Sequence, residues 1–273
     1  MWVLFEHVHA VTYFAPEARA AFEAAGLRGF WRGYFAGRAA PLGPVNAAPV
    51  IALFNVFAPS MVQRAIPDVW SRATPDEALG ARRDGAAAAL RALIGEPSDA
   101  VEEVADLAVR AAGLASTEGR ALGAANAALP MPTDPVARLW QATTTLREHR
   151  GDGHVAALVA AGLSGCLAVV LKAALEDYPS IYGPARGWPE EEWAAARDTL
   201  TSRGLLASDG TPTGEGRAAY GAVEEITDRL AGEVWDGLGP AATDRLAQLL
   251  RPLARTASAL MPDPNPIGLP RLT

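Results

Sequence analysis

The chain has 273 residues and is 50% apolar, so it is long enough for one large domain or two ordinary ones, each with a hydrophobic core. Its 24 Lys and Arg against 31 Asp and Glu give a formal charge of −7, which is the opposite of a surface adapted to nucleic-acid phosphates. These values argue against global disorder and against a general affinity for nucleic acid.

The N-terminal segment is not typical of a secretory signal, because Glu6 and two histidines interrupt its apolar run. The single cysteine, Cys166, cannot form a disulfide framework or a thiolate metal site, and we expect it to act as a small buried hydrophobic residue. The uncharged run 155–171 is shorter than the ~20 residues of a membrane span and is broken by glycines. It predicts two buried helices joined by a tight turn, in a cytoplasmic protein without membrane segments.

Residues that favour helices dominate the chain, and alternating strand-like runs are nearly absent. We therefore expect a mainly α fold, a helical bundle. Helix starts are indicated by Pro16, by Thr74 and by a capping-box pattern at Asp99 and Glu102.

Two segments in different halves of the chain resemble each other. Residues 21–29 and 157–165 match at six of nine positions, with an offset of 136. The match is either a tandem duplication or a chance likeness of Ala-rich helices. The Pro-rich segment 128–135 is the natural boundary, which gives an N-terminal helical half, 1–130, and a C-terminal half, 136–273.

The C-terminal half contains a readable order of elements. A helix ends at Arg203 and Gly204, the short apolar run 205–207 can pair as a strand, residues 208–212 form a turn, and TGEG at 213–216 begins another helix. This order is that of a winged helix and resembles the wing region of MarR-type regulators. The N-terminal half is a degenerate winged helix if the duplication is real.

Three longer segments, HAVTYFAPEARAAFEAAGLRGFWRGYFAGRAAPLG, PDVWSRATPDEAL and LREHRGDGHVAALVAAGL, are also distinctive. They resemble an actinobacterial SalK-like, helix-turn-helix family, and the similarity covers nearly the whole chain. The resemblance implies a winged-helix architecture. It implies little established chemistry, so no catalytic residue is carried over from it.

The charges of the winged-helix region argue against DNA binding. In a MarR-like arrangement, Glu190, Glu191 and Glu192 would begin the helix that enters the major groove. The expected wing carries Asp209 and Glu215 but no Lys or Arg, and residues 186–261 contain 8 Arg, no Lys and 12 acidic residues. Carboxylates at these positions would repel phosphates, so we expect nucleic acid not to be a partner.

A polar cluster precedes the uncharged run. Gly151 and Gly153 flank Asp152, and this pattern predicts that one helix ends there and another begins near His154. Such a turn would project several polar side chains into a cleft: Arg147, His149, Arg150, Asp152 and His154. The alternative is structural, with Asp152 as an N-cap and Glu148 and Arg150 as an ordinary solvated charge pair.

A second group of polar residues lies near the N-terminus, where His9 and Tyr13 are four residues apart and share one face of a helix. If the two halves pair, this face would meet the polar cluster and form a pocket suited to general acid–base catalysis near neutral pH. The candidate catalytic residues are His9, Tyr13, His149, Asp152 and His154. Arg147 or Arg150 would hold an anionic group of the ligand, and Asp152 would orient a histidine.

The segment 29–38 supplies further candidates for ligand binding. Trp31 and Tyr34 would line the pocket or fill the core, and Arg32 and Arg38 need a carboxylate partner or an anionic ligand if they are buried. No metal motif is present, since His149 and His154 are five residues apart and HExxH is absent. Phosphate-binding motifs are absent too, so we expect no metal and no cofactor.

Together these features predict a protein that binds an aromatic or anionic metabolite, as a cofactor-independent acid–base enzyme of specialised metabolism. The alternative is a MarR-like, ligand-responsive transcriptional regulator. The amphipathic segment 241–260 suits a homodimer interface, or it packs on its own domain.

Overall fold

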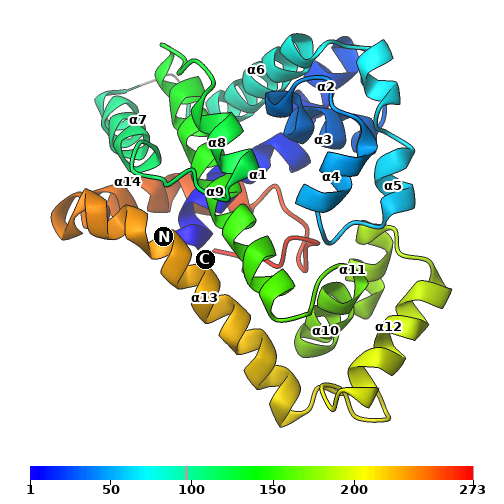
Figure 1. Ribbon diagram of the computed structural model, residues 1–273. Helices are drawn as coiled ribbons and strands as arrows, with labels where there is room; N and C mark the ends of the chain where they lie inside the picture. The colour runs from blue at the N-terminus through cyan, green and yellow to red at the C-terminus, as the bar shows by residue number, and fades with distance from the viewer. Residues whose placement is uncertain (96–97, 273) are drawn as a thin grey trace. The chain divides into compact units, whose positions relative to one another are not determined.

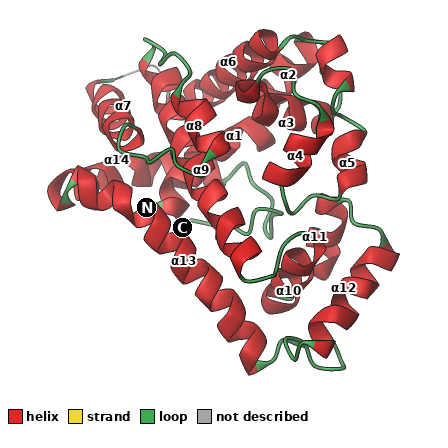
Figure 2. Ribbon diagram, in the orientation of Figure 1, coloured by secondary structure: helices red, strands yellow, loops and turns green. Residues whose placement is uncertain are grey.

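The computed structural model describes residues 1–95 and 98–272. Those residues form fourteen α-helices and two 3-10 helices and contain no β-strand (Figure 2). The prediction of a mainly α fold is therefore confirmed. Within the described residues, no helix combines the length and the apolar character that crossing a membrane requires.

The chain divides into two compact units that are interleaved in sequence. Unit 1 comprises Met1–Asn46, Ala65–Asp152 and Ala231–Thr273, and unit 2 comprises Ala47–Arg64 and Gly153–Leu230. Helices α9 and α13 each begin in one unit and end in the other. The Pro-rich segment 128–135 lies inside unit 1.

Unit 1 is built from helices of very different length. These are α1 (Trp2–Phe14), α2 (Pro16–Ala24), α3 (Phe30–Ala39), η1 (Ala40–Leu42), η2 (Asp68–Ser71), α6 (Pro75–Ile94), α7 (Asp99–Ala112), α8 (Ala121–Ala127), the first part of α9 (Pro135–Ala160), the end of α13 (Gly214–Leu238) and α14 (Pro240–Ser258). Its core joins apolar side chains of α1, α6, α7, α9 and α14 around the fully buried Trp140.

The amphipathic segment 241–260 packs within unit 1. Leu246 and Leu250 of α14 are buried in the core, and the helix contacts α1, α6 and α7. We predicted either a homodimer interface or packing on its own domain for this segment. The packing agrees with the second prediction, because the apolar stripe of α14 is covered by its own unit.

Helix α6 begins and packs as the sequence indicates. The helix start predicted at Thr74 is confirmed, and Thr74 and Glu77 form a full capping box there, which was not predicted from the sequence. Gly85 lets α2 approach closely, since a Cβ at this position would lie 2.8 Å from the Ala18 Cα and 2.8 Å from the Ala21 Cβ. A Cβ at Gly80 of the same helix would meet no atom within 4 Å.

These two glycines give a matched test of the packing. We expect Gly85→Ala to lower the free energy of unfolding by about 1–3 kcal/mol, because the added methyl group forces α2 away from α6. Gly80→Ala is expected to raise it by about 0.5–1 kcal/mol, since alanine favours the helix. Urea denaturation followed by circular dichroism measures both; equal effects of the two substitutions would contradict the close approach.

Unit 2 holds the region for which a winged helix is predicted. Its helices are α4 (Ala47–Leu53), α5 (Pro59–Gln63), the end of α9, α10 (Cys166–Glu176), α11 (Pro179–Arg186), α12 (Glu190–Ser202) and the first part of α13. Leu158, Leu163, Leu171, Leu200 and Val223 are buried together in its core. Between α12 and α13 the chain makes one antiparallel bridge, Leu206 with Pro212, and within the described residues the expected strand is reduced to this bridge.

The two similar segments end their helices in the same way. After α2, Gly26 has φ +86° and the Leu27 amide donates to the Phe22 carbonyl; after α9, Gly162 has φ +63° and the Leu163 amide donates to the Leu158 carbonyl. This hydrogen bond closes a helix C-terminus of Schellman type. The expected tight turn within 155–171 is confirmed, between α9 and α10.

Three local predictions are wrong. Helix α9 continues through Gly151 and Gly153 without a break (Figure 1). Asp152 is therefore not an N-cap of a new helix; its carboxylate instead accepts a hydrogen bond of 2.8 Å from the amide of Gly123, in the first turn of α8. Ser98, not Asp99, is the N-cap of α7, and it makes no side-chain cap hydrogen bond.

Candidate functional site

Unit 1 contains two adjoining pockets that share five lining residues: Thr12, Tyr13, Phe22, Gly33 and Tyr34. The inner pocket adds His9, Gly37, Arg38, Arg82 and Glu148. The outer pocket adds Arg19, Glu23, Leu27, Gly29 and Phe30. Their empty volumes are about 250 and 320 Å³, with the solvent at their mouths included. The five shared residues therefore lie between the two pockets.

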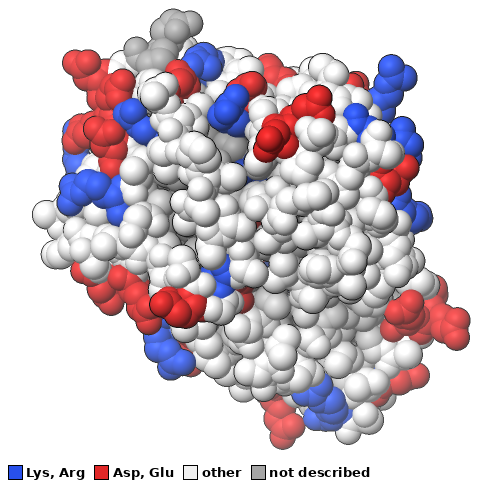
Figure 3. Space-filling model, turned by 45° about the horizontal axis from the view of Figure 1, so that its top comes forward, with Lys and Arg blue, Asp and Glu red and all other residues white. Residues whose placement is uncertain are grey.

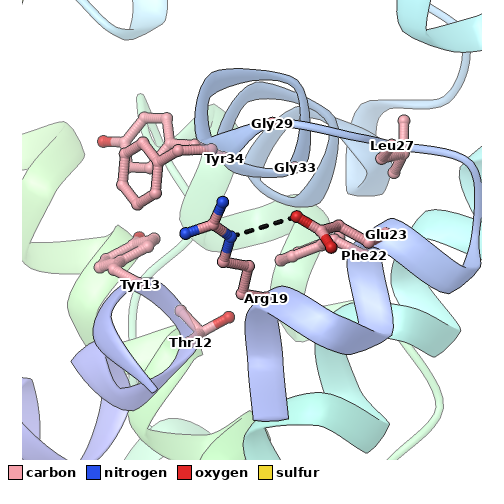
Figure 4. Close-up of a pocket in the computed structure, with 10 residues that line it drawn as sticks. Thr12, Tyr13, Arg19, Phe22, Glu23, Leu27, Gly29, Gly33 and Tyr34 are labelled. Carbon is pink, nitrogen blue, oxygen red and sulfur yellow. Dashed lines mark hydrogen bonds and ion pairs between the residues drawn. The ribbon is translucent and has the colours of Figure 1, made fainter. Parts of the chain in front are cut away.

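The outer pocket ends at an exposed ion pair. The Nε of Arg19 lies 3.1 Å from Glu23 Oε1, and both side chains belong to α2 (Figure 4). Figure 4 also shows Tyr13 and Tyr34 on the same side of the Arg19 guanidinium. The ion pair therefore lies on the exposed side of the outer pocket.

Two glycines of α3 allow the Phe22 ring, which lines both pockets, to pack closely against this helix. A Cβ at Gly33 would lie 2.9 Å from Phe22 Cγ, and a Cβ at Gly37 would lie 2.7 Å from Phe22 Cζ. These residues are four apart, so they lie on one face of the helix. The Phe22 ring occupies the space that side chains at these positions would need, and it lines both pockets.

His9 and Tyr13 are in contact, as their spacing predicts. His9 Nε2 lies 3.0 Å from the Tyr13 hydroxyl oxygen, and His9 Nδ1 lies 2.9 Å from Thr144 Oγ1. The single hydroxyl proton of Thr144 is donated to the Trp140 carbonyl at 2.8 Å. Thr144 can therefore only accept from His9, which places a proton on Nδ1.

The same contacts assign the proton of the phenol. Burial, reinforced by the positive charge of Arg147, holds the pKa of His9 well below its usual value, so the ring is neutral. With Nδ1 protonated, Nε2 carries a lone pair, and the Tyr13 hydroxyl donates to it. Burial also raises the pKa of Tyr13, so the phenol keeps its proton at neutral pH.

Beside this pair lies a buried group of charges in which Arg38 and Arg147 were predicted as site residues and Glu148 was not. Arg38 donates from Nε and Nη2 to the two carboxylate oxygens of Glu148, at 2.9 Å each, and Arg147 donates to Glu148 Oε2 at 2.7 Å. Burial alone would raise the pKa of Glu148, but Arg147 and Arg38 outweigh it and hold this pKa far below the usual value. The prediction of Glu148 as a solvated charge is wrong, because its side chain is 1% exposed.

Arg82 lines the inner pocket together with Arg38, but its hydrogen-bond partners differ from those of Arg38. Its guanidinium donates from Nη1 to the Gly37 carbonyl at 2.9 Å and from Nη2 to Asn126 Oδ1 at 3.1 Å. It also lies 5.3 Å from the ring centroid of Trp140. Its partners are thus neutral, and burial lowers the pKa of Arg82 to about 10.

The four predicted ligand-binding residues of α3 are Trp31, Arg32, Tyr34 and Arg38. Arg38 Nη1 donates to the Tyr34 hydroxyl at 3.0 Å, and the Tyr34 ring is 5.0 Å from the Tyr13 ring. Trp31 packs edge-on against Tyr34. Arg32 lies 3.5 Å from Asp68, with 42% of its side chain exposed. We expected each of these arginines to need a carboxylate partner or an anionic ligand if it is buried. Arg38 and Arg32 each have a carboxylate partner.

Three other residues of the polar cluster, His149, Asp152 and Arg150, do not line either pocket. His149 Nε2 is 3.4 Å from Ser116 Oγ, and burial lowers the pKa of His149 to about 4. Burial raises the pKa of Asp152 to about 6, against the amide hydrogen bonds of Gly123 and Leu122. Arg150 lies 4.4 Å from the ring centroid of Trp2.

His154 belongs to unit 2 and has its own partners there. Its Nδ1 lies 3.0 Å from Thr227 Oγ1 and 3.8 Å from Glu224 Oε1. The structure thus brings His9 and Tyr13 together with Arg147 and Arg38 as neighbours, while His149 and His154 contact other residues.

The sequence contained one signal for Arg82, which was not among the predicted site residues. Ala78, Arg82, Ala86 and Ala89 recur at helical spacing, and all four are buried, so a lone arginine interrupts an apolar stripe. A charged residue at such a position is costly to bury and indicates a specific partner. Thr144 and Phe22 carried no comparable signal.

Among residues 1–95 and 98–272, no group of three or more His, Cys, Asp or Glu side chains is placed to hold a metal ion. A family model described as a helix-turn-helix family matches residues 1–261. No curated protein and no solved structure matches the chain.

Proposed function

We propose that this chain, which belongs to the helix-turn-helix family, binds a small molecule in the inner pocket and transfers a proton to or from it without a cofactor. The observation that carries the proposal is the buried chain of contacts from Thr144 Oγ1 to His9 Nδ1 and from His9 Nε2 to the Tyr13 hydroxyl, from which we infer a neutral His9 with its proton on Nδ1. Tyr13 and His9 both line the inner pocket.

The contacts define a balanced proton relay. As a bound molecule gives a proton to the Tyr13 oxygen, the original Tyr13 proton moves to His9 Nε2 across 3.0 Å. The reverse sequence returns a proton to another atom of the molecule. Because both groups keep their resting protonation at neutral pH, the relay starts from a neutral phenol and a neutral imidazole.

Electrostatics weigh against a DNA-binding role for the helix-turn-helix region. Glu190, Glu191 and Glu192 are exposed in the first turn of α12, the helix that would enter the major groove in a MarR-like arrangement. Unit 2 has seven Lys and Arg against eleven Asp and Glu. On the face that Figure 3 shows, Lys and Arg are interspersed with Asp and Glu instead of forming one basic surface.

The second candidate function is a ligand-responsive regulator with the same pocket. It is favoured by the order α10, α11, α12, bridge and α13, which is the order of a winged helix. A gel shift with duplex DNA at ~50 mM salt separates the two, because phosphate-driven association is visible at this concentration. We expect no shift; a shift by the purified chain would favour the regulator.

Proton transfer can be tested before the substrate is known. The purified chain is incubated in D₂O with a small-molecule extract of the cells that produce it, and mass spectrometry follows deuterium incorporation. The proposal predicts that at least one compound gains deuterium only when active protein is present. If no compound shows protein-dependent exchange, the proton-transfer proposal is contradicted.

A further inference from the structure

We infer that the inner pocket takes a ligand with one anionic group, a carboxylate, and that Arg82 binds this group. The inference rests on the proposed function, since it specifies the class of molecule bound there. It changes the expected anchor from Arg147 or Arg150 to a residue on α6.

The first argument is the hydrogen bonding of Arg82. A guanidinium has five N–H groups, and in Arg82 the described residues accept from two of them, one on Nη1 and one on Nη2. The Nε is buried and has no hydrogen-bond partner. Arg82 is only 4% exposed, so bulk water does not compensate for these donors. The arginine therefore retains the donors that a carboxylate binds.

The second argument is charge balance around the inner pocket. Arg38, Arg82 and Arg147 contribute three formal positive charges, and Glu6 and Glu148 contribute two negative charges. Within the described part of the chain, no carboxylate lies within 4.0 Å of the Arg82 guanidinium. A bound anion would supply the counter-charge that Arg82 lacks.

Further charges lie next to this group, but among the residues that the structure describes none of them forms an ion pair with Arg82. Asp152 is within electrostatic range of Glu148 and Arg38, and Arg120 interacts with both Asp152 and Glu233. Arg38 and Arg147 already bind Glu148 through short hydrogen bonds. A ligand anion would have to compete with Glu148 for these two arginines, whereas Arg82 offers free donors.

Binding at Arg82 would also act on the proton relay. The positive charge of Arg82 is one of the causes that lower the pKa of His9. An anion on Arg82 offsets this charge, so His9 becomes a stronger base when the ligand is present. The ligand would thereby activate the residue that accepts its proton.

The test uses thermal unfolding of the full chain at constant ionic strength, titrated with acetate and benzoate and with their neutral amides, acetamide and benzamide. A ligand that binds only the folded state raises Tm with concentration. We expect at least one carboxylate to raise Tm and its amide to have little effect. In Arg82→Met, the apparent affinity for the carboxylate should fall about tenfold or more, because the charged donors are lost.

Arg245→Met is the matched control, since Arg245 pairs with Glu103 in unit 1, outside the pockets. It should bind the carboxylate as the unmodified chain does. Without ligand, the Tm and the circular dichroism of Arg82→Met are measured first, because the variant loses a buried charge and also the hydrogen bonds to Gly37 and Asn126. This makes loss of binding distinguishable from loss of folding.

Two other outcomes separate the inference from the proposed function. If the amide binds as tightly as the carboxylate, or if Arg82→Met leaves carboxylate binding unchanged, the assignment of Arg82 is overturned and the pocket remains a small-molecule site. If none of the four probes raises Tm, the assignment is overturned and the small-molecule site loses its support as well.

Discussion

Replacing Glu148 with Gln is expected to lower the free energy of unfolding by about 3–5 kcal/mol, the range for a buried ion pair that loses one partner. The amide keeps the shape of the side chain but leaves Arg38 without a counter-charge and Arg147 with only Glu6, at 3.5 Å, in a buried setting. Native domains are stable by only about 5–15 kcal/mol, so this loss is a large share of the total.

The control is Glu103→Gln, because Glu103 also accepts two hydrogen bonds from one arginine, Arg245, at 2.7 and 2.6 Å. That pair is exposed, so we expect its urea midpoint to remain close to that of the unmodified chain. The double variant Arg38→Met with Glu148→Gln should recover part of the stability. A Glu148→Gln midpoint indistinguishable from that of Glu103→Gln would contradict the buried charge group.

Replacing Tyr13 with Phe is expected to slow deuterium exchange into the bound compound by about 10²–10⁴-fold, the usual contribution of a positioned acid–base group. The substitution removes the oxygen that meets the ligand and the proton donated to His9 Nε2. His9→Gln should give a similar loss, because it removes the next acceptor in the same relay.

The double variant Tyr13→Phe with His9→Gln should be no slower than either single variant, since residues that act as one unit are not additive. Tyr178→Phe serves as the control, because Tyr178 is exposed and belongs to unit 2. Exchange in Tyr13→Phe at the rate of this control would remove Tyr13 from the proposed relay.

The local parts of the fold were predictable from the sequence. The contact of His9 with Tyr13 follows from four-residue spacing on one helix, and the helix start at Thr74 follows from its place directly before Pro75. Both depend on residues that are neighbours along the chain. The prediction of a mainly α fold rested in the same way on local helix preference.

The parts that depend on distant residues were not predictable. Arg38 and Glu148 are 110 residues apart, and no local rule pairs them. The expected helix break failed because tertiary contacts hold α9 together: Asp152 accepts from the Gly123 amide, and a Cβ at Gly123 would lie 3.0 Å from the His149 Cα. Such packing outweighs the cost of a glycine in a helix, about 1 kcal/mol.

The tautomer of His9 is the most direct test of the whole account. In protein labelled with ¹⁵N-histidine, the His9 signals can be assigned by their loss in His9→Gln. Because the pKa of His9 is lowered, the account predicts a protonated Nδ1 and an unprotonated Nε2 that persist from about pH 7.5 to about 5.5, across the ordinary histidine pKa of about 6.5. A proton on Nε2 at neutral pH, or titration near the ordinary pKa, would contradict it.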